Sequence, residues 1–176
     1  MSSKSNKVFK MVLAAMFLAV ALVLPFFTGQ IQQIGNMLCP MHLPVILCGY
    51  FCGPWYALLI GIAAPLLRFV LFGMPPIVPI GIAMCFELAV YGVTAGLLYR
   101  AFPQKLVYIY LSLIISMISG RIVWGAVQVV LAGLGKIQFG WEAFIGAAFI
   151  NAIPGIILQL ILIPILVRCL KKYTAR

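Results

Sequence analysis

The chain has 176 residues, of which 65% are hydrophobic and 8% are charged, and its mean hydropathy is +1.21. The few polar residues cannot cover so much apolar surface in water, which excludes a soluble globular protein. The formal net charge of +10 does not indicate nucleic-acid binding, because most basic residues lie beside the ends of apolar runs. That placement is typical of the cytoplasmic face of a membrane protein in contact with anionic lipid. We therefore expect a single integral membrane domain over residues 1–176.

The first apolar run, residues 8–27, predicts a membrane helix and follows the basic residues Lys4, Lys7 and Lys10. It exceeds the apolar segment of a signal peptide and no small-residue cleavage site follows it, so we interpret it as a retained helix. The polar, uncharged residues 28–36 are typical of an outer loop. The next apolar segment, residues 40–53, is too short to cross a bilayer comfortably. We expect either a half-length helix or one extended by the preceding loop.

Four longer apolar segments follow. The third span ends at Phe72, and the proline-rich residues 73–79 cannot continue a helix. The fourth span covers residues 80–99, the fifth 106–134 and the sixth 141–170. Six crossings would place both basic ends of the chain in the cytoplasm. The expected fold class is an all-α membrane protein, a six-transmembrane-helix bundle with both termini cytoplasmic.

Charged side chains inside the spans predict a binding site. Ions in hydrocarbon are costly and normally face a protein interior or a wet cavity, where they mark a substrate path. Along the fifth span, polar residues recur on one helical face at the spacing i, i+3, i+7. By position along their spans, the polar residues converge in the outer half of the membrane, where glutamines 30, 32 and 33 approach from the loop. The expected substrate-binding residues are His42, Arg68, Glu87, Tyr91, Arg121, Trp124, Gln128 and Asn151.

Each of these residues also has a purely structural interpretation. Glu87 can form an ion pair with Arg68 or Arg121, and the sequence leaves open which arginine it is. The aromatic residues can fill a bundle core, and His42 can anchor at the membrane interface. Several polar groups at one depth nevertheless exceed what packing requires, and a few convergent polar groups between apolar walls are typical of a small-ligand pocket.

Catalysis is not expected from this sequence. Two acidic residues and one histidine provide neither an acidic metal cluster nor a serine–histidine–acid set. Cys39 and His42 can share a metal in principle, but two ligands do not make a site, and the five cysteines have no paired spacing. We therefore expect no enzyme activity, no cofactor and no metal. Uphill transport of a solute would need energy from another protein.

Small residues four apart let membrane helices approach closely. This spacing occurs at Ala15 and Ala19, and again in the pairs Gly49 with Gly53 and Gly92 with Gly96. It is explained either by packing inside the protein or by a docking face for a partner subunit.

Several motifs are informative in their order: Pro40-Met-His42-Leu-Pro44, Cys52-Gly53-Pro54, Phe72-Gly73-Met74-Pro75-Pro76 and Phe86-Glu87-Leu88-Ala89-x-Tyr91-Gly92. In this the chain resembles the substrate-binding (S) components of energy-coupling-factor (ECF) vitamin transporters. The resemblance implies a six-helix protein of the prokaryotic cytoplasmic membrane that captures a small vitamin outside the cell. It also implies docking, through Ala15 and Ala19, on a transmembrane coupling subunit driven by two cytoplasmic ATPase subunits, followed by toppling to release the cargo.

The substrate remains open at this point. Pantothenate, with its carboxylate and hydroxyls, would suit Arg121 together with Glu87 or Asn151. A pyridoxine-like or hydroxymethylpyrimidine ring would suit stacking on Trp124 and Tyr91, with Glu87 as acceptor. The competing interpretations are a stand-alone facilitator or channel and a scaffold that transports nothing. A channel should line a continuous polar path, but the inner half offers little beyond Gln159.

Overall fold

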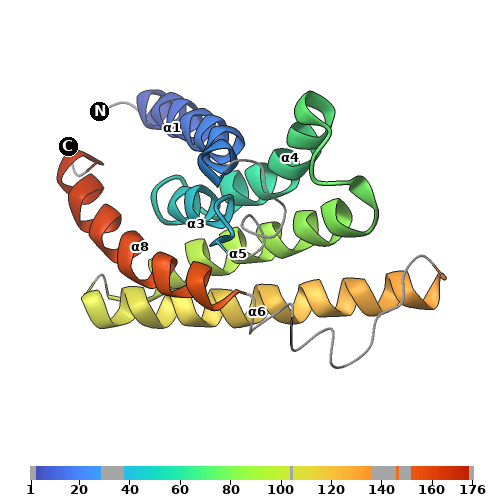
Figure 1. Cartoon of the computed structure of the whole chain (residues 1–176). Helices are drawn as coiled ribbons and strands as arrows, with labels where there is room; N and C mark the ends of the chain where they lie inside the picture. Colours follow the sequence, from blue (N-terminus) through green and yellow to red (C-terminus); the bar gives the residue numbers. More distant parts are fainter. Residues whose placement is uncertain (1–2, 29–37, 104, 136–145, 147–151, 175–176) are drawn as a thin grey trace.

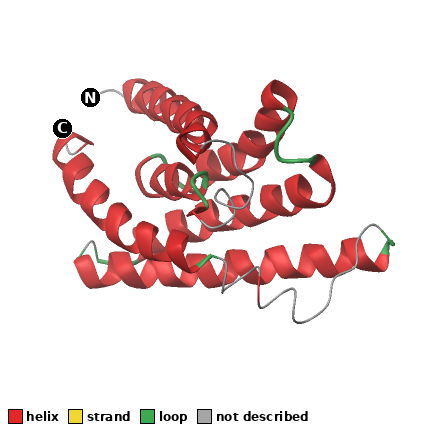
Figure 2. Cartoon of the chain, viewed as in Figure 1, coloured by secondary structure: helices red, strands yellow, loops and turns green. Residues whose placement is uncertain are grey.

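A computed structural model describes residues 3–28, 38–103, 105–135, 146 and 152–174 of the chain. Within those ranges all regular secondary structure is helical (Figure 2). The elements are α1 (Ser3–Val23), the 3-10 helix η1 (Leu24–Thr28), α3 (His42–Phe51), α4 (Pro54–Phe72), the π-helical turn η2 (Ile77–Gly81), α5 (Ile82–Ala101), α6 (Leu106–Gly133) and α8 (Ile153–Thr174). Among the described residues, five helical segments are long and apolar enough to cross a membrane. The chain is therefore a helical multi-pass membrane protein.

The helix boundaries follow the expected breakers. α4 and α6 end within one residue of the expected positions, and α5 is preceded by the proline-rich turn. α1 begins earlier than expected, at Ser3, because no breaker precedes Pro25. Its geometry changes to 3-10 at Leu24, since Pro25 has no backbone N–H with which to continue the α-helical ladder. Most of the first part of the expected sixth span, residues 141–152, lies outside the described residues.

α3 is the half-length helix that the sequence allowed. Its ten residues span about 15 Å at the usual helical rise, which is about half of the hydrocarbon thickness of a bilayer. Nine of the ten are buried, because α1, α4, α5 and α8 all pack against this helix. α3 is thus enclosed by protein, and its first residue, His42, lies inside the bundle.

Successive helices alternate in direction (Figure 1). α3 turns back into α4 through Gly53, at φ 110°, and α4 ends on Gly73, at φ 71°; both values favour glycine. α5 lies between α4 and α6, and the start of α1 and the end of α8 lie on the same side of the bundle (Figure 1). We call this the basic side. Lys7 and Lys10 lie in the first turns of α1, Arg100 at the end of α5, Lys105 directly before α6 and Arg168 near the end of α8.

The backbones of α3 and α5 are in direct contact through glycine. A Cβ atom added at Gly49 would lie 2.5 Å from the carbonyl oxygen of Gly92 and 3.1 Å from the backbone nitrogen of Gly96. The glycine pair on α5 therefore serves internal packing. Ala15 and Ala19, by contrast, are exposed on α1.

Candidate functional site

A buried cluster of charged and polar side chains joins three helices inside the bundle. The carboxylate oxygen Oε1 of Glu87, on α5, lies 3.0 Å from Nη1 of Arg121, on α6. The same oxygen lies 3.3 Å from Nε2 of His42, at the start of α3. All three side chains are at least nine-tenths buried. Of the two arginines that the sequence offered, Arg121 is the partner of Glu87.

The local sequence explains why these residues meet. Glu87 lies about one and a half turns from the start of α5, and Arg121 lies near the middle of the antiparallel helix α6. His42 meets them because it is the first residue of α3, and this end of α3 is buried inside the bundle. The cluster therefore occupies the part of the bundle away from the basic side.

Tyr91 forms one wall of the cluster. Its ring meets that of His42 edge to face, with centroids 4.8 Å apart and planes at 85°. Gly120 on α6 also lies against the ring, because a Cβ added there would overlap it. The ring of Tyr91 is therefore wedged between His42 on α3 and Gly120 on α6.

Cys39 is a member of the cluster that was not among the expected binding residues; the sequence suggested it only as a possible metal ligand beside His42. Its sulfur accepts a hydrogen bond from Nη2 of Arg121 at 3.3 Å, and its backbone adopts a positive φ of 46°. Gly120 was missed as well. The only sequence signals were proximity: Cys39 precedes His42 by three residues, and Gly120 precedes Arg121 by one.

Several buried polar atoms around the cluster lack a hydrogen-bond partner in the part of the chain that the structure covers. They are Nδ1 and Nε2 of His42, Oε1 of Glu87, Nε of Arg121 and Oε1 of Gln128. The short contacts of Glu87 with Arg121 and His42 thus lack hydrogen-bond geometry. Leaving such a group unpaired costs about 1–3 kcal/mol. Native proteins seldom retain several of them without a ligand or ordered water.

The polar face that the sequence predicted for the fifth span lies on α6. Arg121, Gly125 and Gln128 are buried on it, and Trp124 is half-buried between them. On α8, Gln159 is a further buried amide whose Oε1 has no hydrogen-bond partner within the described ranges. The expected contributions from Asn151 and from glutamines 30, 32 and 33 lie outside the described residues.

Arg68 is placed elsewhere. Its Nη1 donates a 2.7 Å hydrogen bond to the carbonyl oxygen of Leu22. Its guanidinium carbon lies 5.1 Å from the ring centroid of Phe26 and 5.5 Å from that of Phe72. Arg68 thus ties α4 to the end of α1, and the expectation that it converges with Glu87 is not met because its side of α4 faces α1.

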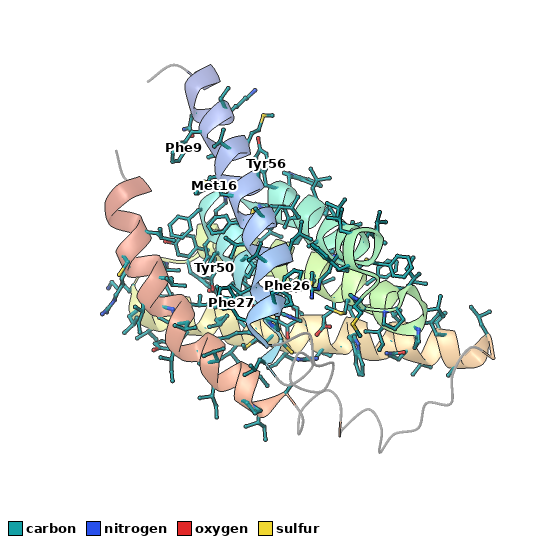
Figure 3. All side chains as sticks on the ribbon, turned by 45° about the horizontal axis from the view of Figure 1, so that its top comes forward. Phe9, Met16, Phe26, Phe27, Tyr50 and Tyr56 are labelled. Carbon is teal, nitrogen blue, oxygen red and sulfur yellow. The ribbon has the colours of Figure 1, made fainter. Side chains whose placement is uncertain are left out.

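The half of the bundle nearest the basic side contains polar groups that bond to each other. The hydroxyls of Tyr50 and Ser112 are 2.8 Å apart, and Ser112 also donates to the carbonyl of Ile109 at 2.9 Å. Tyr50 stacks on Tyr99 at 4.5 Å. In Figure 3, where α1 is in front, Tyr50 is labelled beside it. Because these groups satisfy one another, they join α3, α5 and α6 at this end of the bundle.

A family model described as "ECF transporter, substrate-specific component" matches residues 9–167. The matched segment includes every member of the cluster and nearly all of the bundle. Searches among curated proteins and among solved structures found no match.

Proposed function

The chain belongs to the family of substrate-specific components of ECF transporters, and from this premise we propose that it captures a small water-soluble vitamin or vitamin precursor. It would take the solute from outside a prokaryotic cell and deliver it to a transmembrane coupling subunit driven by two cytoplasmic ATPase subunits. The chain itself would be a single membrane domain without catalytic activity.

We propose six crossings of the cytoplasmic membrane, with both termini in the cytoplasm. The alternating helix directions and the common side of the start of α1 and the end of α8 support an even number of crossings (Figure 1). The five cations of the basic side support its cytoplasmic location by the positive-inside rule. α3, although short, would count as the second crossing together with the residues before it.

The observation that carries the binding proposal is the set of buried groups around Glu87 and Arg121 that have no hydrogen-bond partner among the described residues. A solute would complete their bonding, with Tyr91 and Trp124 as aromatic walls. The proposed contacts are His42, Glu87, Tyr91, Arg121, Trp124, Gln128 and Asn151. The candidate solutes are pantothenate and pyridoxine- or hydroxymethylpyrimidine-like compounds.

Ligand identification tests this proposal directly. The full chain is purified in mild detergent, and native mass spectrometry is used to detect and identify a co-purified small molecule. Well-folded Glu87→Gln and Arg121→Ala variants should lose most of its affinity. Full affinity in both variants would show that the cluster is only structural.

The proposed docking surface is the exposed face of α1 around Ala15 and Ala19. Exposed apolar side chains such as Phe9 and Met16 lie along the same helix (Figure 3). Ala15→Leu or Ala19→Leu should abolish ATP-dependent uptake and leave solute binding intact, because only the approach of the coupling subunit is blocked. Ala126→Leu, at an exposed alanine of α6, is the matched control. A stand-alone facilitator would instead move solute without the ATPase subunits.

A further inference from the structure

The charges of the cluster balance each other within the protein. Arg121 is 8% exposed and Glu87 is 2% exposed, and their charged atoms are 3.0 Å apart. A carboxylate bound to Arg121 would compete with Glu87 and bring a second negative charge beside it. A cationic amine bound to Glu87 would meet Arg121 in the same way. Like charges placed together in a buried site are strongly unfavourable.

The other arginine within a span is committed elsewhere. Arg68 bonds the carbonyl of Leu22, in a turn where Pro25 supplies no N–H donor. The remaining cationic side chains that the structure describes, those of the basic side, lie at helix ends away from the cluster. A solute with a net negative charge would therefore find no uncommitted cation among the described residues near Glu87.

The unpartnered atoms define what the solute must offer. Nε2 of His42 faces Glu87, so we place the imidazole proton there, which leaves Nδ1 as an acceptor. Oε1 of Gln128 is a second acceptor, whereas Nε of Arg121 is a donor. A matching solute presents at least two hydrogen-bond donors and one acceptor. Hydroxyl and amino groups on a neutral ring or polyol meet that requirement.

We infer, on the basis of the proposed function, that the solute carries no net charge and bears hydroxyl or amino donors, and that it has no free carboxylate. Hydroxymethyl-substituted pyridines and pyrimidines fit this description. Their rings also suit the walls formed by Tyr91, which is fully buried, and by the half-buried Trp124. Pantothenate does not fit, because its carboxylate would have to displace Glu87 from Arg121.

Matched pairs of compounds test the inference with the purified full chain. Pantothenate is compared with pantothenol, and 4-pyridoxate with pyridoxine, by calorimetry and by thermal unfolding. In any pair that binds, the uncharged alcohol should bind about tenfold more tightly or better, the ratio expected when one charge-assisted contact is disturbed. Tighter binding of the carboxylate would overturn the inference and leave the proposed function standing.

If none of the four compounds binds, the inference is tested by the net charge at pH 7 of the small molecule that co-purifies with the chain. An uncharged molecule supports the inference and a charged one overturns it. If no compound binds and no small molecule co-purifies, the proposed function fails and the inference fails with it.

A charge variant provides an independent test. Glu87→Gln leaves Arg121 unmatched, so the affinity ratio should shift towards the carboxylate of each pair by about tenfold. Thr94→Val, a near-isosteric change on the same helix, should keep the wild-type ratio. If Glu87→Gln does not fold, Arg121→Gln should shift preference towards the cationic pyridoxamine over pyridoxine. A ratio that stays at the wild-type value in the variant that folds would contradict the charge argument.

Discussion

Replacing Gly120 by alanine should disturb the cluster through Tyr91 without touching a charged group. The new Cβ would lie 3.1 Å from Cγ of Tyr91 and closer still to two other ring carbons, whereas carbon atoms pack best at about 3.5–4.0 Å. Tyr91 is 1% exposed, so the ring is enclosed by protein. The strain is relieved by moving the ring towards His42, or by separating α5 from α6.

The expected magnitude follows from two opposing effects. Overpacking a well-packed core costs about 1–3 kcal/mol, while alanine gains up to about 1 kcal/mol over glycine in helix propensity. We expect a net loss of about 1–2 kcal/mol in stability from the difference of these terms. We also expect solute affinity to fall about tenfold, because His42 turns away from Glu87.

Gly133→Ala is the matched control. It lies on the same helix, and a Cβ there would meet no atom within 4 Å. Thermal unfolding in detergent and calorimetric titration of the identified solute measure both effects. If Gly120→Ala and Gly133→Ala have the same stability and the same affinity for the solute, then Tyr91 is not held between α3 and α6 as we describe.

Two further changes address the contacts outside the cluster. Arg68→Gln should lower the thermal unfolding temperature, because the shorter side chain leaves the Leu22 carbonyl unpaired at a cost of about 1–3 kcal/mol. Arg68→Lys should restore part of the loss. Equal stability of the wild type and both variants would show that Arg68 does not tie α1 to α4. Tyr50→Phe should cost only about 1 kcal/mol, since the ring still stacks on Tyr99 and Ser112 keeps its bond to Ile109. Solute affinity measured in Tyr50→Phe should be unchanged, and a large loss would instead place Tyr50 on the solute path.

The sequence predicted the long helices well because their ends are chemically marked. α4 lies between Gly53 and Gly73, both at positive φ, and prolines precede α5. The pairing of Glu87 with Arg121 was among the alternatives, since positions along the spans estimate depth. Depth does not give the rotation of a helix, however. Arg68 was therefore expected at the site because of its depth, whereas in the structure it faces α1.

Cys39 shows a second limit of the sequence argument. It lies in an irregular segment with a positive φ, where neither helical periodicity nor hydropathy indicates a direction for the side chain. Gly120 shows a third, because a missing side chain leaves no chemical signal of its own. Its importance appears only once the ring of Tyr91 is seen to occupy the space.

The enclosure of α3 has a consequence for how the protein enters the bilayer. A ten-residue helix is too short to be released into lipid as an independent segment, since about 20 residues are needed. Gly53 leaves almost no linker before α4, so α3 and α4 should leave the insertion machinery together as one hairpin. The carboxylate of Glu87 would then become shielded from lipid only after α5 and α6 have been synthesised, which makes the middle of the chain the critical stage of biogenesis.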